Sequence, residues 1–157
     1  MQIKDFLIDK SLKELTEHRT VVFQIACYET KVNQNSNGYI PIHWHDELQF
    51  VLVRKGEVFF QINEEKMTIR EGEGLFNNSG CLHMAKDQYD SSCAYICLNV
   101  SPSFIFITRT LYPLCKSLYS VDYMPYIHLV PKEFWAKNIL DSMMKINHLK
   151  RRLTLKK

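Results

Sequence analysis

The feature that most constrains the fold of this chain is a series of short β patterns between residues 47 and 100. Apolar, β-branched and aromatic residues dominate each run, and tight turn signals such as Lys55-Gly56 separate one run from the next. No helical pattern lies between the runs, although parallel strands would need such crossovers. The series therefore predicts an antiparallel sandwich or barrel. The predicted strands are 47–54, 57–63, 66–70, 74–77, 82–86 and 93–100, with an earlier one at 21–28.

The flanking segments have other patterns. Residues 1–19 are expected to form an N-terminal arm or a short helix, because a few apolar residues fall at helical spacing there. Residues 20–101 are expected to form the barrel, and residues 102–157 a helical extension. Within this extension, a helix is expected from about Pro113 and a short extended piece at 126–130.

An amphipathic helix is predicted after Pro131, since apolar residues recur there at helical steps and basic residues follow at its end. The residues of this stripe are Trp135, Ile139, Met143 and Ile146. The stripe has two interpretations. It is either a dimer surface or the face by which the helix packs on its own barrel.

The charge distribution does not predict a DNA-binding surface on the barrel. The net charge is +3, but the last eight residues, KRRLTLKK, carry five positive charges, which leaves 15 basic and 17 acidic residues elsewhere. No apolar run reaches the roughly 20 residues of a membrane helix. Asp5 and Asp9 interrupt what would have to be the apolar core of a signal peptide. We therefore expect a cytoplasmic protein without membrane contact.

Three histidines and one glutamine form the candidate site. On a single strand spanning 39–56, His43, His45 and Gln49 would share one face, because alternate side chains point the same way. His83 follows a turn at 78–80 that would return the next strand beside the first. Imidazoles from two strands could hold a divalent transition metal such as Zn, Fe, Ni or Mn. The four residues could equally bind the hydroxyls or carboxylate of a small molecule, or satisfy one another.

These spacings resemble the two motifs of the cupin superfamily, which are small jelly-roll barrels, also described as double-stranded β-helices. In the first motif His43, His45 and Gly56 match, while Gln49 stands where the family has glutamate. In the second motif Gly72, Gly80 and His83 match, while Asn78 and Asp87 replace proline and asparagine. The resemblance implies a three-histidine metal site that lacks the family's carboxylate.

A longer run, from HWHDELQFVLVRKG through YIHLVP, resembles the N-terminal sensing and dimerisation domain of AraC-family transcription regulators over about residues 20–150. The resemblance implies a barrel that binds a small effector, often a sugar, and helices that form a homodimer. It also implies that a separate C-terminal domain with two helix-turn-helix motifs contacts DNA, and we expect no such domain within these 157 residues. The expected function is therefore effector sensing, without enzymatic activity and without a required cofactor.

Two alternatives remain open. The chain is either a part of a longer regulator or a free-standing metal-binding cupin enzyme of oxygenase or isomerase type. In the sensing interpretation, His43, His45, Gln49 and His83 select the ligand. The apolar walls of the pocket would come from Val51, Val53, Phe59 and Phe76.

Overall fold

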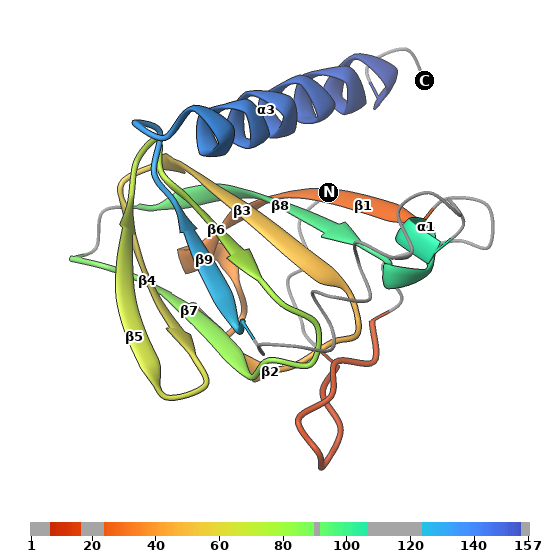
Figure 1. The fold of residues 1–157 in the computed structure, drawn as a ribbon. Coiled ribbons are helices and arrows are strands. Elements are labelled where there is room, and N and C mark those ends of the chain that lie inside the picture. Colours follow the sequence, from red (N-terminus) through yellow and green to blue (C-terminus); the bar gives the residue numbers. More distant parts are fainter. Residues whose placement is uncertain (1–6, 17–23, 90–91, 107–123, 155–157) are drawn as a thin grey trace.

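Two antiparallel sheets face each other in the computed structural model of the chain, which describes residues 7–16, 24–89, 92–106 and 124–154 (Figure 1). The five-stranded sheet has the order β1 (Ile25–Lys31), β8 (Ala94–Val100), β3 (Leu48–Lys55), β6 (Gly74–Asn77) and β9 (Tyr126–Leu129). The four-stranded sheet has the order β2 (Tyr39–His43), β7 (His83–Asp87), β4 (Glu57–Ile62) and β5 (Glu65–Arg70). A short 3-10 turn, η1 (Val32–Gln34), follows β1. This architecture confirms the predicted mainly-β jelly roll followed by a C-terminal helix.

The main core lies between the two sheets. It forms because alternate residues of each strand point inward, where they are removed from water. Strand β4 shows this period most clearly, since Val58, Phe60 and Ile62 are buried while the residues between them are partly exposed. The other strands add Ile40, Val51, Val53, Ile69, Leu75, Ala85, Tyr95 and Cys97.

A second core lies on the outer face of the five-stranded sheet, beneath helix α3 (Phe134–Thr154). Ala136, Leu140 and Met143 of α3 pack there against sheet residues such as Leu52 and Ile96. Strand β8 is therefore buried on both faces, which explains its continuous apolar run. In Figure 1, α3 runs along the top of the molecule and the N-terminal arm hangs from the bottom.

The structure divides the stretch 39–56 that the sequence assigned to one strand. β2 ends at His43 and β3 begins at Leu48, so the two strands belong to different sheets. The expectation of one continuous strand face was therefore wrong. His45 and Glu47 lie in the connection between the sheets, and the chain must bend there to pass from one layer to the other.

Other differences concern the ends of the chain. Residues 7–16 contain a tight turn and no helix, with an isolated bridge between Ile8 and Glu14. α1 (Pro102–Phe106) opens the segment expected to be helical, and β9 forms where a short extended piece was expected at 126–130 and joins the five-stranded sheet. The helix expected near Pro113 lies outside the described residues. Within the described ranges, no helix is long and apolar enough to cross a membrane.

Strand β2 carries an irregularity that matters for the site. Ile40 pairs with Ala85 and His43 pairs with His83, so three steps along β2 match two steps along β7. This is a β-bulge, in which one extra residue changes which face the following side chains occupy. Ile40 and His43 are both buried, whereas strict alternation would place them on opposite faces.

Candidate functional site

The predicted site residues meet at one end of the barrel. His43 is the last residue of β2 and His83 the first of β7, and the two are direct partners in the strand pairing. His45 lies in the connection to β3, where its carbonyl accepts a hydrogen bond from the backbone N–H of Gly80 (2.9 Å). Gln49 lies at the start of β3. The turn at 78–81 thus joins the two motifs.

The three imidazoles are buried and close together. The ring centroids lie 4.3 Å apart for His43 and His83, 4.9 Å for His45 and His83, and 5.8 Å for His43 and His45. One nitrogen from each ring lies within 4.8 Å of the others. Two nitrogen ligands of one ion lie no more than about 4 Å apart, so a single ion could contact all three rings after they shift slightly toward it.

Backbone carbonyls fix the tautomer of each ring. The Nδ1 atoms of His43, His45 and His83 lie 2.7, 3.1 and 2.8 Å from the carbonyl oxygens of Pro41, Glu47 and Cys81. A carbonyl only accepts hydrogen bonds, so each Nδ1 carries a proton, and in the neutral form of each ring Nε2 carries the lone pair. Metal-binding histidines are oriented in this way, by a hydrogen bond from the nitrogen that does not bind the metal.

The Nε2 atoms have different surroundings. The amide nitrogen of Gln49 lies 3.3 Å from Nε2 of His45 and donates to it. Nε2 of His83 is buried without a hydrogen-bond partner among the described residues. Burial, together with the neighbouring His43 and His45, lowers the pKa of His83 well below its usual range, so this ring is neutral at physiological pH.

These residues fit a divalent transition metal. Three imidazoles whose Nδ1 atoms are all held by backbone carbonyls suit zinc, iron or nickel, and the unsatisfied Nε2 of His83 is a donor that such an ion would use. Binding at His45 would require Gln49 to release the lone pair that it now contacts. The adjoining cavity has a volume of about 30 Å³, room for one or two waters.

Two buried amides extend the polar cluster beyond the predicted residues. Gln49 is paired with Asn99 on one side and Asn77 on the other, and directly paired residues point to the same face of a sheet. The Asn77 amide is buried, and neither its nitrogen nor its oxygen has a hydrogen-bond partner in the described part of the chain. The sequence contained a signal for this row, because asparagine is unfavourable inside strands and both asparagines lie in strong β patterns.

A buried carboxylate from the N-terminal arm also belongs to the site. Glu14 has only 6% of its surface exposed, and its Oε2 lies 3.7 Å from Nε2 of His43. Glu47 has a carboxylate oxygen at the same distance from His45, but beside Nδ1 on the other side of the ring. Nothing in the sequence pattern singled out Glu14, since the contact joins segments far apart in the chain.

Some residues predicted for the site lie elsewhere. Val51 and Val53 belong to the inner core, but Phe59 and Phe76 point away from it. Phe59 lies under the Lys86 ammonium, and Phe76 stacks on Phe50. The expectation that these two aromatics wall the pocket was therefore wrong.

The predicted dimer stripe on α3 is divided between two environments. Met143 is 2% exposed and packs in the chain's own outer core, and Ile139 lies half-buried against the same core. Trp135 and Ile146 are 49% and 37% exposed. The stripe therefore packs on the chain's own barrel through Met143 and Ile139, while Trp135 and Ile146 remain exposed.

The family model described as the AraC-like ligand binding domain matches residues 24–109, which is more than half of the chain. This chain belongs to that family. The match begins just before β1 and includes all four predicted site residues.

Comparison with known proteins gives one close relative and more distant structures. The chain is 57% identical over 152 residues to the uncharacterized HTH-type transcriptional regulator YdeC of Bacillus subtilis. That alignment covers 94% of this chain and 50% of the relative, so the chain spans about half the length of the regulator that it matches.

Two solved structures are similar at low sequence identity. A cupin protein from Bacteroides fragilis is 18% identical with a TM-score of 0.41, covering 50% of this chain and 64% of its own. An RmlC-like cupin from Shewanella frigidimarina is 15% identical with a TM-score of 0.41, covering 52% and 72%. Neither bears on the function of this chain.

Proposed function

We propose that this chain is the sensing domain of a transcription regulator and binds a small molecule in the polar end of its barrel. The observation that carries the proposal is a set of buried polar atoms inside a domain of this family that lack hydrogen-bond partners among the described residues. Buried polar groups normally have partners, so atoms such as Nε2 of His83 and the Asn77 amide indicate a bound molecule or water. The ligand would control transcription in the cytoplasm through a DNA-binding region outside these 157 residues.

The donors and acceptors suit a hydroxylated ligand, and a sugar is the candidate that we favour. A hydroxyl group both donates and accepts, and the amides of Gln49, Asn77 and Asn99 offer both functions in one row. A sugar is larger than the cavity of about 30 Å³. We therefore infer that the ligand enters only when the N-terminal arm, which places Glu14 against the cavity, moves aside.

A ligand panel tests this proposal. Sugars, polyols and small carboxylic acids would be screened by the shift in unfolding temperature, and the dissociation constant of each hit measured. Gln49→Met keeps the length of the side chain but removes its hydrogen bonds, so we expect binding to weaken about tenfold or more. The control is Gln88→Met, far from the site on a partly exposed turn. Equal binding by wild type and Gln49→Met would place the ligand elsewhere.

We also propose that His43, His45 and His83 hold a divalent transition metal. Their Nε2 lone pairs and fixed tautomers support this. A bound metal would supply positive charge that polarises a ligand oxygen.

The alternative of a free-standing metal-dependent enzyme has the same three histidines in its favour. We propose that the domain is not an enzyme, since it belongs to the AraC-like ligand binding family and its 57% identical relative is named as a transcriptional regulator. Turnover of a hit from the ligand panel, or oxygen consumption by the metal-loaded protein, would favour the enzyme.

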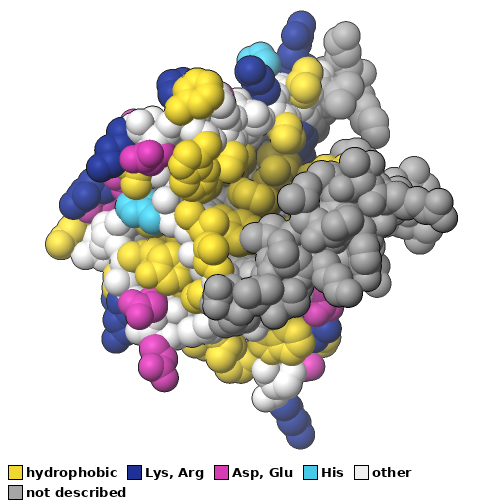
Figure 2. Space-filling view, viewed as in Figure 1, with side chains coloured by type: hydrophobic (Ala, Val, Ile, Leu, Met, Phe, Trp, Pro, Cys, Tyr) yellow, Lys and Arg dark blue, Asp and Glu magenta, His cyan; other side chains and the backbone are white. Residues whose placement is uncertain are grey.

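We further propose a homodimer formed through the exposed side of α3. Trp135 and Ile146 are eleven residues apart, which at 3.6 residues per turn places them on the same side of the helix. Leu149 is exposed on the same side. Figure 2 shows hydrophobic side chains gathered over α3 and the strands beneath it. Exposed apolar patches of this kind mark association surfaces.

Substitution of Trp135 and Ile146 by glutamate tests the dimer. We expect the double variant to dissociate at least about tenfold more readily, because a buried tryptophan commonly carries much of the binding energy of an interface. Sedimentation equilibrium measures the change. Lys145→Glu, which also adds an acid on an exposed position of α3, is the control. A double variant that dimerises like wild type would exclude this surface.

A further inference from the structure

The N-terminal arm is joined by backbone hydrogen bonds to the segment that carries two of the histidines. Lys13 and Trp44 form an isolated parallel bridge. The N–H of Glu14 donates to the carbonyl of Trp44 (2.9 Å), and the N–H of Trp44 donates to the carbonyl of Leu12 (2.9 Å). Trp44 lies between His43 and His45 in the sequence, so these hydrogen bonds hold the arm beside the segment that carries both histidines.

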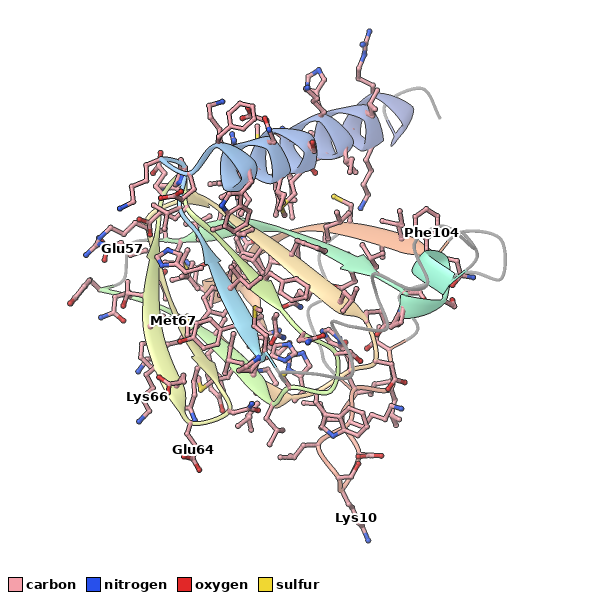
Figure 3. All side chains as sticks on the ribbon, viewed as in Figure 1. Lys10, Glu57, Glu64, Lys66, Met67 and Phe104 are labelled. Atoms are coloured by element: carbon pink, nitrogen blue, oxygen red, sulfur yellow. The ribbon has the colours of Figure 1, made fainter. Side chains whose placement is uncertain are left out.

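Side chains hold the arm in the same position. The indole N–H of Trp44 donates to the carbonyl of Ser11 (2.9 Å), and the Lys13 ammonium lies 4.8 Å from the centre of the Trp44 ring. The same ammonium pairs with Asp46 at 2.8 Å. Lys10, labelled in Figure 3, marks the tip of the arm and points away from the barrel. The tip of the arm is thus exposed to solvent, while residues 11–14, which follow the tip, lie against the site.

Residues 11–14 of the arm place one carboxylate, that of Glu14, inside the site. The Glu14 side chain is almost fully buried, and its Oε2 faces Nε2 of His43, the ring nitrogen that does not contact the Pro41 carbonyl. Metal–nitrogen and metal–oxygen bonds are about 2.0–2.2 Å long, so two ligands of one ion lie no more than about 4 Å apart. The separation of 3.7 Å between Glu14 Oε2 and His43 Nε2 is within this limit. The ligand atoms that all lie within 4.8 Å of one another among the described residues are those of the three histidines, so Glu14 would reach the ion from the side of His43.

We propose that Glu14 is the fourth protein ligand of the metal held by His43, His45 and His83. This inference rests on the metal proposed above. The position of the carboxylate in the first cupin motif is occupied here by Gln49, a weak ligand, and Glu14 supplies a carboxylate from another segment. A buried carboxylate is stabilised by nearby positive charge, and a divalent cation among neutral imidazoles provides it.

A consequence is that metal binding and docking of the arm are linked. If the docked arm supplies a ligand, the metal binds more tightly to the docked state than to the undocked state. By reciprocity, the metal must then favour docking by the same factor. Protection of the arm's amides from hydrogen exchange therefore tests whether Glu14 is a metal ligand, independently of the measured metal affinity.

Titration of Zn²⁺ into the metal-free 157-residue chain tests the proposal. Calorimetry would compare wild type with Glu14→Gln, which keeps the size of the side chain and removes its charge. We expect Glu14→Gln to bind Zn²⁺ at least about tenfold more weakly, since even residues outside the ligand set change affinity by that factor. Glu47→Gln is the matched control, because its carboxylate is equally distant from a histidine but lies beside Nδ1. It should bind Zn²⁺ much as wild type does.

Hydrogen exchange supplies the second measurement. In wild type, Zn²⁺ should slow exchange at the amides of Glu14 and Trp44 at least about tenfold, and in Glu14→Gln it should change them little. Glu14→Asp retains the charge on a shorter side chain and should give intermediate affinity. It also carries the test if Glu14→Gln does not fold.

The outcomes distinguish the two proposals. Equal Zn²⁺ affinity and equal protection in wild type and Glu14→Gln would overturn the role of Glu14 and leave the three-histidine site standing. Absence of Zn²⁺ binding by wild type would overturn both. An equal loss of affinity in Glu14→Gln and Glu47→Gln would show a general effect of charge and overturn ligation by Glu14.

Discussion

Gly74→Ala will lower the free energy of unfolding by about 3 kcal/mol or more, because no space exists for a methyl group at this position. A Cβ at residue 74 would lie 2.5 Å from the carbonyl oxygen of Val51 and 2.5 Å from a methyl carbon of Leu140. The Leu140 side chain could rotate, but the Val51 oxygen belongs to the backbone of β3 and cannot. Relief of the backbone contact would require β6 to separate from β3. Urea denaturation measures the change.

Gly72→Ala is the matched control for this prediction. Gly72 has a φ of +84°, which is unfavourable for alanine, but no atom lies within 4 Å of the added methyl. Its cost should be about 1 kcal/mol, which is the penalty for a left-handed conformation alone. A Gly74→Ala protein no less stable than Gly72→Ala would mean that α3 and β6 do not pack as closely as described.

The metal-free protein will gain about 2.7 kcal/mol of unfolding free energy when Zn²⁺ is present at one hundred times its dissociation constant. The gain arises because the metal binds the folded chain, where three histidines converge, and not the separated residues of the unfolded chain. His83→Ala removes the central imidazole of the cluster and should abolish the gain. Thermal unfolding with and without Zn²⁺ measures this difference for each protein.

His128→Ala is the control for this measurement. His128 lies on β9 beside Glu73 and outside the cluster, so this variant should keep the full gain. If Zn²⁺ still stabilised His83→Ala but no longer stabilised His128→Ala, the metal would bind near His128 and not at the proposed three-histidine site. No stabilisation in wild type would exclude the site.

The strands were predictable because their signals are local. Alternating burial and turn residues fix where a strand begins and ends, and β6 was predicted at 74–77, where the structure has it. The passage of 39–56 from one sheet to the other was not predictable from this pattern. Apolar residues dominate both β2 and β3, so the local pattern does not mark a break, and the bend between the strands depends on packing of the two layers.

Spacing and resemblance predicted that the four site residues converge, but the structure brings them together in a different way from the shared strand face that we expected. His43 and His45 do not share a strand, and their rings meet because β2 is bulged and the chain then bends. Glu14 was missed because its approach depends on the arm docking thirty residues away in the sequence. Long-range contacts of this kind leave no periodic pattern in a single sequence.

The two faces of α3 show a similar limit. Helical spacing identified the apolar stripe. A helix turns by 100° per residue, so residues near the edge of a stripe can face either the barrel or the solvent. Met143 and Trp135 differ in this way, and only the position of the barrel decides between them.

The bulge in β2 makes the pairing of this strand part of the site's chemistry. It absorbs one extra residue, so His43 faces inward three positions after Ile40, and the Pro41 carbonyl lies beside its ring. A relative that kept this residue but lost the bulge would return to strict alternation, and its first imidazole would face solvent although every histidine remained in the sequence. A relative that lost the residue together with the bulge would keep the imidazole inside, so counting histidines alone would not separate the barrels that can use them from those that cannot.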